Sequence, residues 1–328
     1  MIYDKSEATM QRFSAAVVGD IHGENWFFRY DGPTLLVAIA IYASWILLLW
    51  FHQSIPWYVM APVAGYIVQW HFSLQHEAIH SFRGVPKWLR TAVVWPPIGG
   101  WFPFELYRRF HSQHHRNTHL TFPGEDTETY YHQEGDWENY GPLWNWLYTV
   151  NQTFLGRVLV GPFLRTPRLY ANEIRRIACK DYSNVGIWVR HFIGVGLILV
   201  LVSRVFGMPI WQYLIEFIYT GMMFGMVRTF IEHRWGERPS ERTAVVESNW
   251  LFGLLFLWNN LHAVHHTFPT LAWYRVPRVW REHRARIIEH NGGYVFRGYG
   301  EIARRWLLQP VFIPVHPPSR RDGQTRVS

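Results

Sequence analysis

Histidine is concentrated in three short motifs of this 328-residue chain. The motifs are HEAIH at residues 76–80, HSQHH at 111–115 and HAVHH at 262–266. Within each motif the outer histidines are four residues apart, so on a helix their imidazoles project from one face. Neutral imidazole is a good ligand for iron, zinc, copper and nickel. The motifs therefore predict a metal site assembled from distant parts of the chain.

Eight motif histidines exceed the shell of one ion, which holds about four to six ligands, and suit two ions. A ninth candidate, His233, follows the last long apolar segment and is expected at the same depth. The predicted metal ligands are His76, His80, His111, His114, His115, His233, His262, His265 and His266. The chain has one cysteine, Cys179, which excludes zinc or iron–sulfur sites built from several cysteines.

Other polar residues near the motifs have two interpretations each. Glu125, Asp126 and Glu128 follow the second motif and either orient ligand histidines or are solvated. No general acid or base is assigned.

Four apolar segments can position the histidines: Leu35–Phe51, Ile55–Leu74, Val185–Val202 and Ile210–Val227. The first has 17 residues without a charge, which at about 1.5 Å each cover most of a bilayer core of about 30 Å. The sequence predicts an all-α polytopic membrane protein with two transmembrane helical hairpins, hence four spanning helices. A re-entrant or interfacial segment is expected at 88–104, and one amphipathic helix lying in the interface is expected at 141–164. A cytoplasmic helical cap is expected to hold the di-metal site.

The distribution of arginine and lysine predicts the orientation. The joins at 52–54 and 203–209 contain only Arg204, whereas the segment 165–180 contains five basic residues and 228–242 contains four. Basic loops stay in the cytoplasm, so every histidine motif is expected on that side of a bacterial inner membrane. The predicted divisions are a cytoplasmic N-terminal segment at 1–30, a membrane domain at 31–290 and a C-terminal tail at 291–328.

Composition agrees with a membrane protein better than with a nucleic-acid-binding one. Tryptophan, at 19 residues, and an aromatic share of 18% suit a large surface at the water–lipid boundary. The net charge of +8 comes mostly from arginines between apolar segments, with no compact lysine-rich stretch. We therefore expect membrane partners and no nucleic acid.

The three motifs resemble those of the membrane fatty acid desaturase family, which carries HxxxH, HxxHH and HxxHH around two transmembrane hairpins. The flanking stretches HSQHHRNTHLTFPGEDTET and NNLHAVHHTFPTLAWYRVP are also similar, and the resemblance covers about Leu35 to Pro277. It implies two non-haem iron ions held mainly by the nine histidines, with O2 as co-substrate. Some members have an asparagine one helical turn before the last single histidine, which holds a metal-bound water; here that position is Thr229. Asn260, two residues before His262, is the substitute candidate for this part in cofactor binding or for a hydrogen bond to a ligand; the alternative is that it only satisfies backbone groups at a helix end.

The resemblance favours a fatty-acyl or acyl-lipid desaturase that introduces a C=C bond. A hydroxylase or ketolase of hydrocarbons, fatty acids or carotenoids, using the same centre, is the alternative. A non-enzymatic metal or proton transporter is a third, but it predicts polar residues deep in the spans, where Glu216 is nearly alone.

The reaction also needs electrons from elsewhere. The chain has no GxGxxG loop, no cysteine cluster and no HPGG haem signature, so a separate ferredoxin or cytochrome with its reductase is implied. A basic patch could bind such a carrier or anionic lipid: Arg275, Arg278, Arg281, Arg284 and Arg286.

Overall fold

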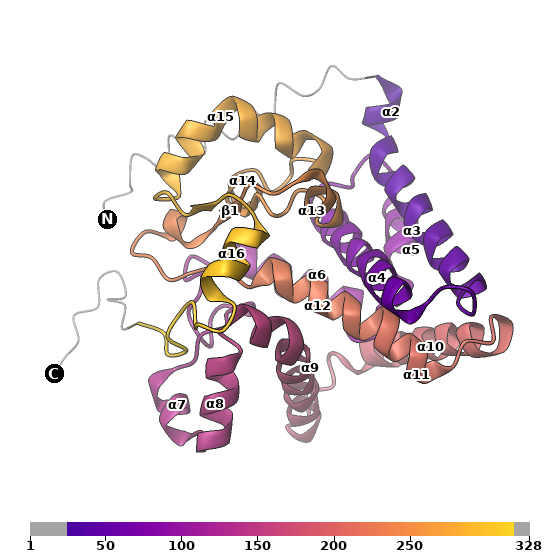
Figure 1. Ribbon diagram of the computed structural model, residues 1–328, viewed down its shortest axis with the longest axis horizontal. Coiled ribbons are helices and arrows are strands. Elements are labelled where there is room, and N and C mark those ends of the chain that lie inside the picture. Colours follow the sequence, from indigo (N-terminus) through magenta and orange to yellow (C-terminus); the bar gives the residue numbers. More distant parts are fainter. Residues whose placement is uncertain (1–24, 318–328) are drawn as a thin grey trace.

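The computed structural model describes residues 25–317, which form a mainly helical body (Figure 1). A short helix α2 (Trp26–Arg29) leads into the first hairpin, α3 (Gly32–Trp50) and α4 (Trp57–His80). Pro33 in the first turn of α3 and Pro56 just before α4 fit helix starts, where a missing N–H costs nothing. The predicted first hairpin is therefore present, and its second helix runs on through the first histidine motif.

The second hairpin begins with α10 (Val185–Val200) and its π-helical end η1 (Leu201–Val205). The chain returns through a continuous helical segment made of α11 (Ile210–Tyr213), the π-helical η2 (Leu214–Tyr219) and α12 (Thr220–Thr229). The rings of Trp50 and Phe206 lie 6.3 Å apart, so the turns of both hairpins meet at one end of the molecule.

Small residues bring α4 and α12 close together. A Cβ atom on Gly65 would lie 2.6 Å from Thr220 Oγ1, and one on Gly221 would lie 2.5 Å from Val68 Cγ1. Only glycine permits this separation of the two backbones. The close packing holds the end of α4 beside the end of α12, which brings the first motif and His233 to the same end of the molecule.

The remaining helices lie around this bundle, toward the end opposite the hairpin turns (Figure 1). α5 (Lys87–Val94) and α6 (Phe104–Arg116) follow the first hairpin, and α7 (Glu134–Asn139), α8 (Pro142–Val150) and α9 (Phe154–Ala178) precede the second. A cap follows α12, and its helices are α13 (Trp250–Leu255), α14 (His262–Thr267), α15 (Val276–His290) and α16 (Tyr299–Trp306). It also contains the 3-10 turns η3 (Pro239–Arg242) and η4 (Trp273–Arg275) and two parallel two-residue strands, β1 (Val245–Val246) and β2 (Val295–Phe296).

The single helix predicted at 141–164 is wrong. The chain breaks at Asn151–Thr153, and α9 starts afresh because the Thr153 hydroxyl accepts a hydrogen bond from the backbone N–H of Gly156. α9 also runs to Ala178, well beyond the predicted end. The segment 88–104 is broken as expected: α5 ends at Val94, and the turn that follows buries Ile98 completely.

Two helices in the described residues are long and apolar enough to cross a bilayer, Gly32–Trp50 and Val185–Val205. Both carry exposed apolar side chains on the outside of the body, including Leu36, Ile39, Phe192 and Leu197. The fold is thus mostly helical as predicted, whereas four spanning helices and the domain limits stay predictions. Residues 1–24 and 318–328 lie outside the described part, but β2 and α16 show that the chain remains folded beyond residue 290.

Candidate metal centre

The nine predicted ligands come from four places in the fold and meet beneath the cap. His76 and His80 lie in the last turn of α4, and α14 begins at His262. The second motif occupies the final turns of α6, and His233 follows α12. The helix ends are what make convergence possible, because each presents two or three imidazoles along one stripe.

The histidines form two groups, and within each group one nitrogen per residue lies within 4.8 Å of all the others. The five-histidine group is His76, His80, His111, His115 and His265. The four-histidine group is His114, His233, His262 and His266. The groups adjoin, since the rings of His115 and His266 stack with centroids 4.4 Å apart. The second and third motifs each contribute histidines to both groups.

The spacing of the ring nitrogens fits shared ions. In the four-histidine group, His233 Nε2 lies 3.1 Å from His114 Nε2 and 3.0 Å from His262 Nε2. In the five-histidine group, His115 Nε2 lies 3.1 Å from His111 Nε2 and 2.9 Å from His265 Nε2. Two nitrogens each about 2.1 Å from one ion, at right angles, would be about 3.0 Å apart. These residues therefore fit two neighbouring ions with imidazole ligands.

The other ring nitrogen of several ligands is held by a hydrogen bond. His111 Nδ1–H donates to Glu128 (2.8 Å), His114 Nδ1–H to Asp126 (2.7 Å), His233 Nδ1–H to the Arg242 carbonyl (3.2 Å) and His262 Nδ1–H to Asn259 (3.0 Å). A proton fixed on Nδ1 leaves Nε2 free to bind a metal and fixes the plane of the ring. Of the two interpretations of the loop carboxylates, orientation of ligands holds for Asp126 and Glu128.

Burial keeps the centre's imidazoles neutral. It lowers the pKa of His233 to about 3 and holds the pKa of His262, His265 and His266 well below the usual value. His114 differs: burial lowers its pKa, but nearby Glu128 and Asp126 outweigh burial and leave the pKa raised. Neutral imidazole is the form that binds metals, so most of the centre needs to lose no proton on loading.

The sequence as a whole decides the family. The family model "Fatty acid desaturase" matches residues 53–298, which include all nine histidines. The chain belongs to the fatty acid desaturase family. No curated protein matches it significantly. This desaturase-family chain is accordingly an oxidoreductase of desaturase or hydroxylase type that acts on lipids and is associated with membranes.

Two other positions named from the sequence have defined surroundings in this desaturase. The Asn260 amide donates to the Val246 carbonyl (2.7 Å) and is buried, so its part in cofactor binding stays a prediction. The Thr229 hydroxyl pairs with the Tyr130 hydroxyl (2.9 Å), which is also bound by Arg165 (2.6 Å). Thr229 is thus engaged in a polar network beside the centre.

Sequence reasoning missed Asn259 and gave Glu232 no role. Asn259 contacts one histidine of each group, and Glu232 Oε1 lies 3.3 Å from His262 Nδ1 while pairing with Arg228. Asn259 is three residues before His262, but the chain between them is not helical, so no periodic spacing pointed to it. The signal for Glu232 was its position next to His233.

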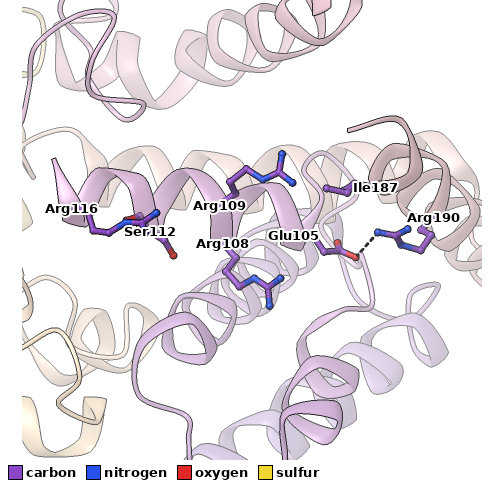
Figure 2. Close-up of a pocket in the computed structure, with 7 residues that line it drawn as sticks. All are labelled: Glu105, Arg108, Arg109, Ser112, Arg116, Ile187 and Arg190. Atoms are coloured by element: carbon purple, nitrogen blue, oxygen red, sulfur yellow. Dashed lines mark hydrogen bonds and ion pairs between the residues drawn. The ribbon is translucent and has the colours of Figure 1, made fainter. Parts of the chain in front are cut away.

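The outer face of α6 carries a basic groove of about 500 Å³ (Figure 2). Its lining residues are Glu105, Arg108, Arg109, Ser112, Arg116, Ile187 and Arg190. Glu105 pairs with Arg190 (3.7 Å), and Arg109 donates to Asn184 (2.5 Å). One helix therefore presents candidate metal-binding histidines inward and arginines outward, so the groove is separated from the centre by only the thickness of α6.

Proposed function

We propose that this protein catalyses the O2-dependent oxidation of an unactivated lipid hydrocarbon chain at a non-haem di-iron centre, and that it is a fatty-acyl or acyl-lipid desaturase that introduces a C=C bond. The observation that supports this is the pair of adjoining histidine groups in a member of the desaturase family. Nine imidazoles and no thiolate suit iron better than a structural zinc site, which takes four ligands.

The chain's own residues would hold and orient the iron ions. Two ions bound there would activate O2 and supply the oxidant that removes hydrogen from a methylene group. The Nδ1 hydrogen bonds to Glu128, Asp126 and Asn259 keep the ligand rings in place. A hydrocarbon chain offers no polar handle, so its position against the centre has to come from the shape of apolar surroundings.

We also propose that the protein crosses the membrane four times, with the metal centre on the cytoplasmic side. α3 and α10 expose many apolar side chains. A large apolar surface is unfavourable in water, and the lipid of a bilayer would cover it. α4 has 24 residues and, at about 1.5 Å each, is long enough to cross. The helical segment 210–229 is of similar length, and the hairpin turns lie together, as two antiparallel pairs require.

A separate electron donor, a ferredoxin or a cytochrome with its reductase, is part of the proposal. Of the five arginines predicted as its docking patch, Arg278 pairs with Glu282 (2.8 Å) and Arg284 with Glu247 (2.7 Å), which reduces the free charge of that patch. The basic groove over α6 is the better docking surface for an acidic carrier, because α6 itself carries three of the ligands.

Expression in a bacterial host of known lipid composition tests the reaction. Mass spectrometry of the lipids should show products two mass units lighter than the substrate, which are absent with a His265→Ala variant. Products that gain oxygen instead would establish the hydroxylase or ketolase alternative. Purified protein that holds no tightly bound iron and leaves every lipid unchanged would contradict the enzyme proposal and favour a transport function.

A further inference from the structure

The turn before the third histidine motif has an uncommon backbone. Leu257 and Trp258 are consecutive and have φ values of 46° and 59°, in the left-handed region. Residues other than glycine seldom adopt this conformation, and two in a row are rarer still, because the Cβ atom crowds the backbone. Such strain persists only where surrounding contacts impose it, and it is often found at functional sites.

Contacts with α13 hold the turn in place. The Trp258 backbone N–H donates to the Gly253 carbonyl (2.7 Å), and the Asn259 N–H donates to the Phe256 carbonyl (3.0 Å). The Trp258 ring packs on Gly253 so closely that a Cβ atom there would lie 2.6 Å from ring atom Cη2. A glycine at 253 is therefore a condition for this turn.

The turn directs the buried Asn259 side chain between the two histidine groups. Asn259 Oδ1 accepts from Nδ1–H of His262, a member of the four-histidine group (3.0 Å). Its Nδ2 lies 3.3 Å from His76 Nε2, a member of the five-histidine group. The other acceptors for Nδ1, namely Glu128, Asp126 and the Arg242 carbonyl, each bond a single histidine of the centre.

Glu232 is the rival acceptor for His262. Its Oε1 lies 3.3 Å from the same Nδ1, but that oxygen makes no hydrogen bond with a protein group, and the carboxylate pairs with Arg228. The amide oxygen of Asn259 is nearer and has hydrogen-bonding geometry. The tautomer of His262 is thus set by a neutral amide.

We infer that Asn259 is a positioning residue that couples the two metal groups, and that the left-handed turn at Leu257 and Trp258 serves to aim it. The amide oxygen keeps the His262 proton on Nδ1, so that Nε2 faces the four-histidine group. The amide nitrogen of the same side chain packs against the His76 ring across the boundary between the groups. This inference rests on one part of the proposed function, namely that the two histidine groups bind iron, and does not depend on which reaction follows.

Metal affinity, measured without any turnover, tests the inference. Asn259→Leu has nearly the same volume and loses the hydrogen bond to His262, whereas Asn259→Asp keeps an oxygen acceptor for His262. The matched control is Asn184→Leu, at another buried asparagine whose side chain bonds Glu173 and Arg109 rather than a histidine of the centre. Iron per chain and chelator competition are measured on purified full-length protein, with thermal unfolding of the metal-free protein alongside.

We expect Asn259→Leu to weaken retention of one of the two ions about 10- to 100-fold, the usual effect of removing a partner that orients a ligand. Asn259→Asp should restore retention of that ion. Asn184→Leu should lower the unfolding temperature without changing the affinity. The inference is overturned if Asn259→Leu retains both ions as the wild type does, or if Asn184→Leu loses iron to the same extent.

Gly253→Ala provides a second test that leaves every polar group of the centre in place. The added Cβ pushes the Trp258 ring and should disturb the aim of Asn259, so the same ion should be lost more readily; unchanged release would count against the role of the turn. Failure of the proposed function looks different: a wild type that binds two irons but oxidises no lipid leaves the inference standing. A wild type that oxidises lipid while Asn259→Leu retains both ions refutes only the inference.

Discussion

At the scale of single residues, the centre depends on groups that hold histidines as much as on the histidines themselves. Asp126 shows this most clearly: its Oδ1 accepts from His114 Nδ1–H, and its Oδ2 accepts from the backbone N–H of Thr121. The carboxylate is buried, and His114 and backbone donors overcome the effect of burial and lower its pKa. One side chain therefore ties a ligand to the loop that follows it.

Asp126→Asn should weaken metal binding without unfolding the protein. The amide loses the charge that favours the Nδ1 proton of His114, and we expect affinity for one ion to fall about 10- to 100-fold. Glu125→Gln is the control, because Glu125 pairs with His119, which belongs to neither group. Chelator competition on the two variants measures the difference, and equal affinities would argue against the orienting role of Asp126.

The buried imidazoles should make the metal-free protein sensitive to acid. His233 has a pKa of about 3 when folded and an ordinary value of 6.5, so between these values the unfolded chain binds a proton that the folded chain does not. Stability is therefore complete above about pH 6.5 and falls as the pH drops toward 3. Denaturant unfolding of metal-free protein should show this slope, and His233→Gln should make it shallower. A slope unaffected by His233→Gln would mean that other groups dominate.

The clustering of the nine histidines could be predicted from sequence because their spacing puts those of each motif on one helix face; that they bind metal stays a prediction. The roles of Asp126 and Glu128 stayed open because they lie in a loop. The way a loop folds back against a helix leaves no periodic pattern in the sequence. Asn259 was missed in favour of Asn260 because the left-handed turn at Leu257 and Trp258, which decides which amide faces the centre, cannot be foreseen in residues other than glycine.

At the scale of elements, the packing of α4 against α12 decides whether the groups can meet. Both helices carry candidate ligands at or just beyond their ends, and Gly65 and Gly221 permit their close approach.

The apolar segments predicted the helices of both hairpins to within a few residues, because a long uncharged run has few stable structures open to it other than a long apolar helix. The division into α8 and α9 was missed because Asn151–Thr153 contains neither glycine nor proline, the usual signals of a break.

Gly221→Ala should damage both stability and the centre. The new Cβ would lie 2.5 Å from Val68 Cγ1, so α4 and α12 must separate, at a cost of about 1–3 kcal/mol. Iron retention should fall with it, because the separation moves His76 and His80 relative to His233. Gly196→Ala is the control, since a Cβ there meets no atom within 4 Å. Thermal unfolding and iron content report the two effects, and a stable, fully loaded Gly221→Ala protein would refute the argument.

The basic groove over α6 makes a prediction about the electron donor. Replacing Arg108 and Arg116 with glutamine removes charge from the groove but leaves the inward-facing histidines of α6 in place. With a plant-type [2Fe–2S] ferredoxin and its reductase as donor, KM for ferredoxin should rise about tenfold at low salt, kcat should hold, and the difference should shrink at high salt. The control is the pair Arg304→Gln and Arg305→Gln, which line a separate basic groove on α16. An equal rise in KM in the control would place docking elsewhere.

At the scale of the whole molecule, charged and apolar side chains are segregated along the axis that runs from the hairpin turns to the metal centre. The turns of both hairpins lie together at one end, while the metal centre and its arginine-rich surroundings lie at the other (Figure 1). Between them, α3 and α10 present apolar side chains outward. This division agrees with a bilayer around the hairpins and a cap in the cytoplasm, because basic residues stay on the cytoplasmic side.

The single cysteine allows the orientation to be measured. Cys179 is exposed, follows α9 and lies on the side predicted to be cytoplasmic. A membrane-impermeant maleimide should therefore label it in inside-out vesicles and leave it unlabelled in intact spheroplasts. The converse probe is Ser54→Cys in a Cys179→Ser background, because exposed Ser54 lies in the turn of the first hairpin; it should be labelled in spheroplasts. Labelling of both positions from the same side would contradict an odd number of crossings between residues 54 and 179, and with it the placement of the metal centre opposite the hairpin turns.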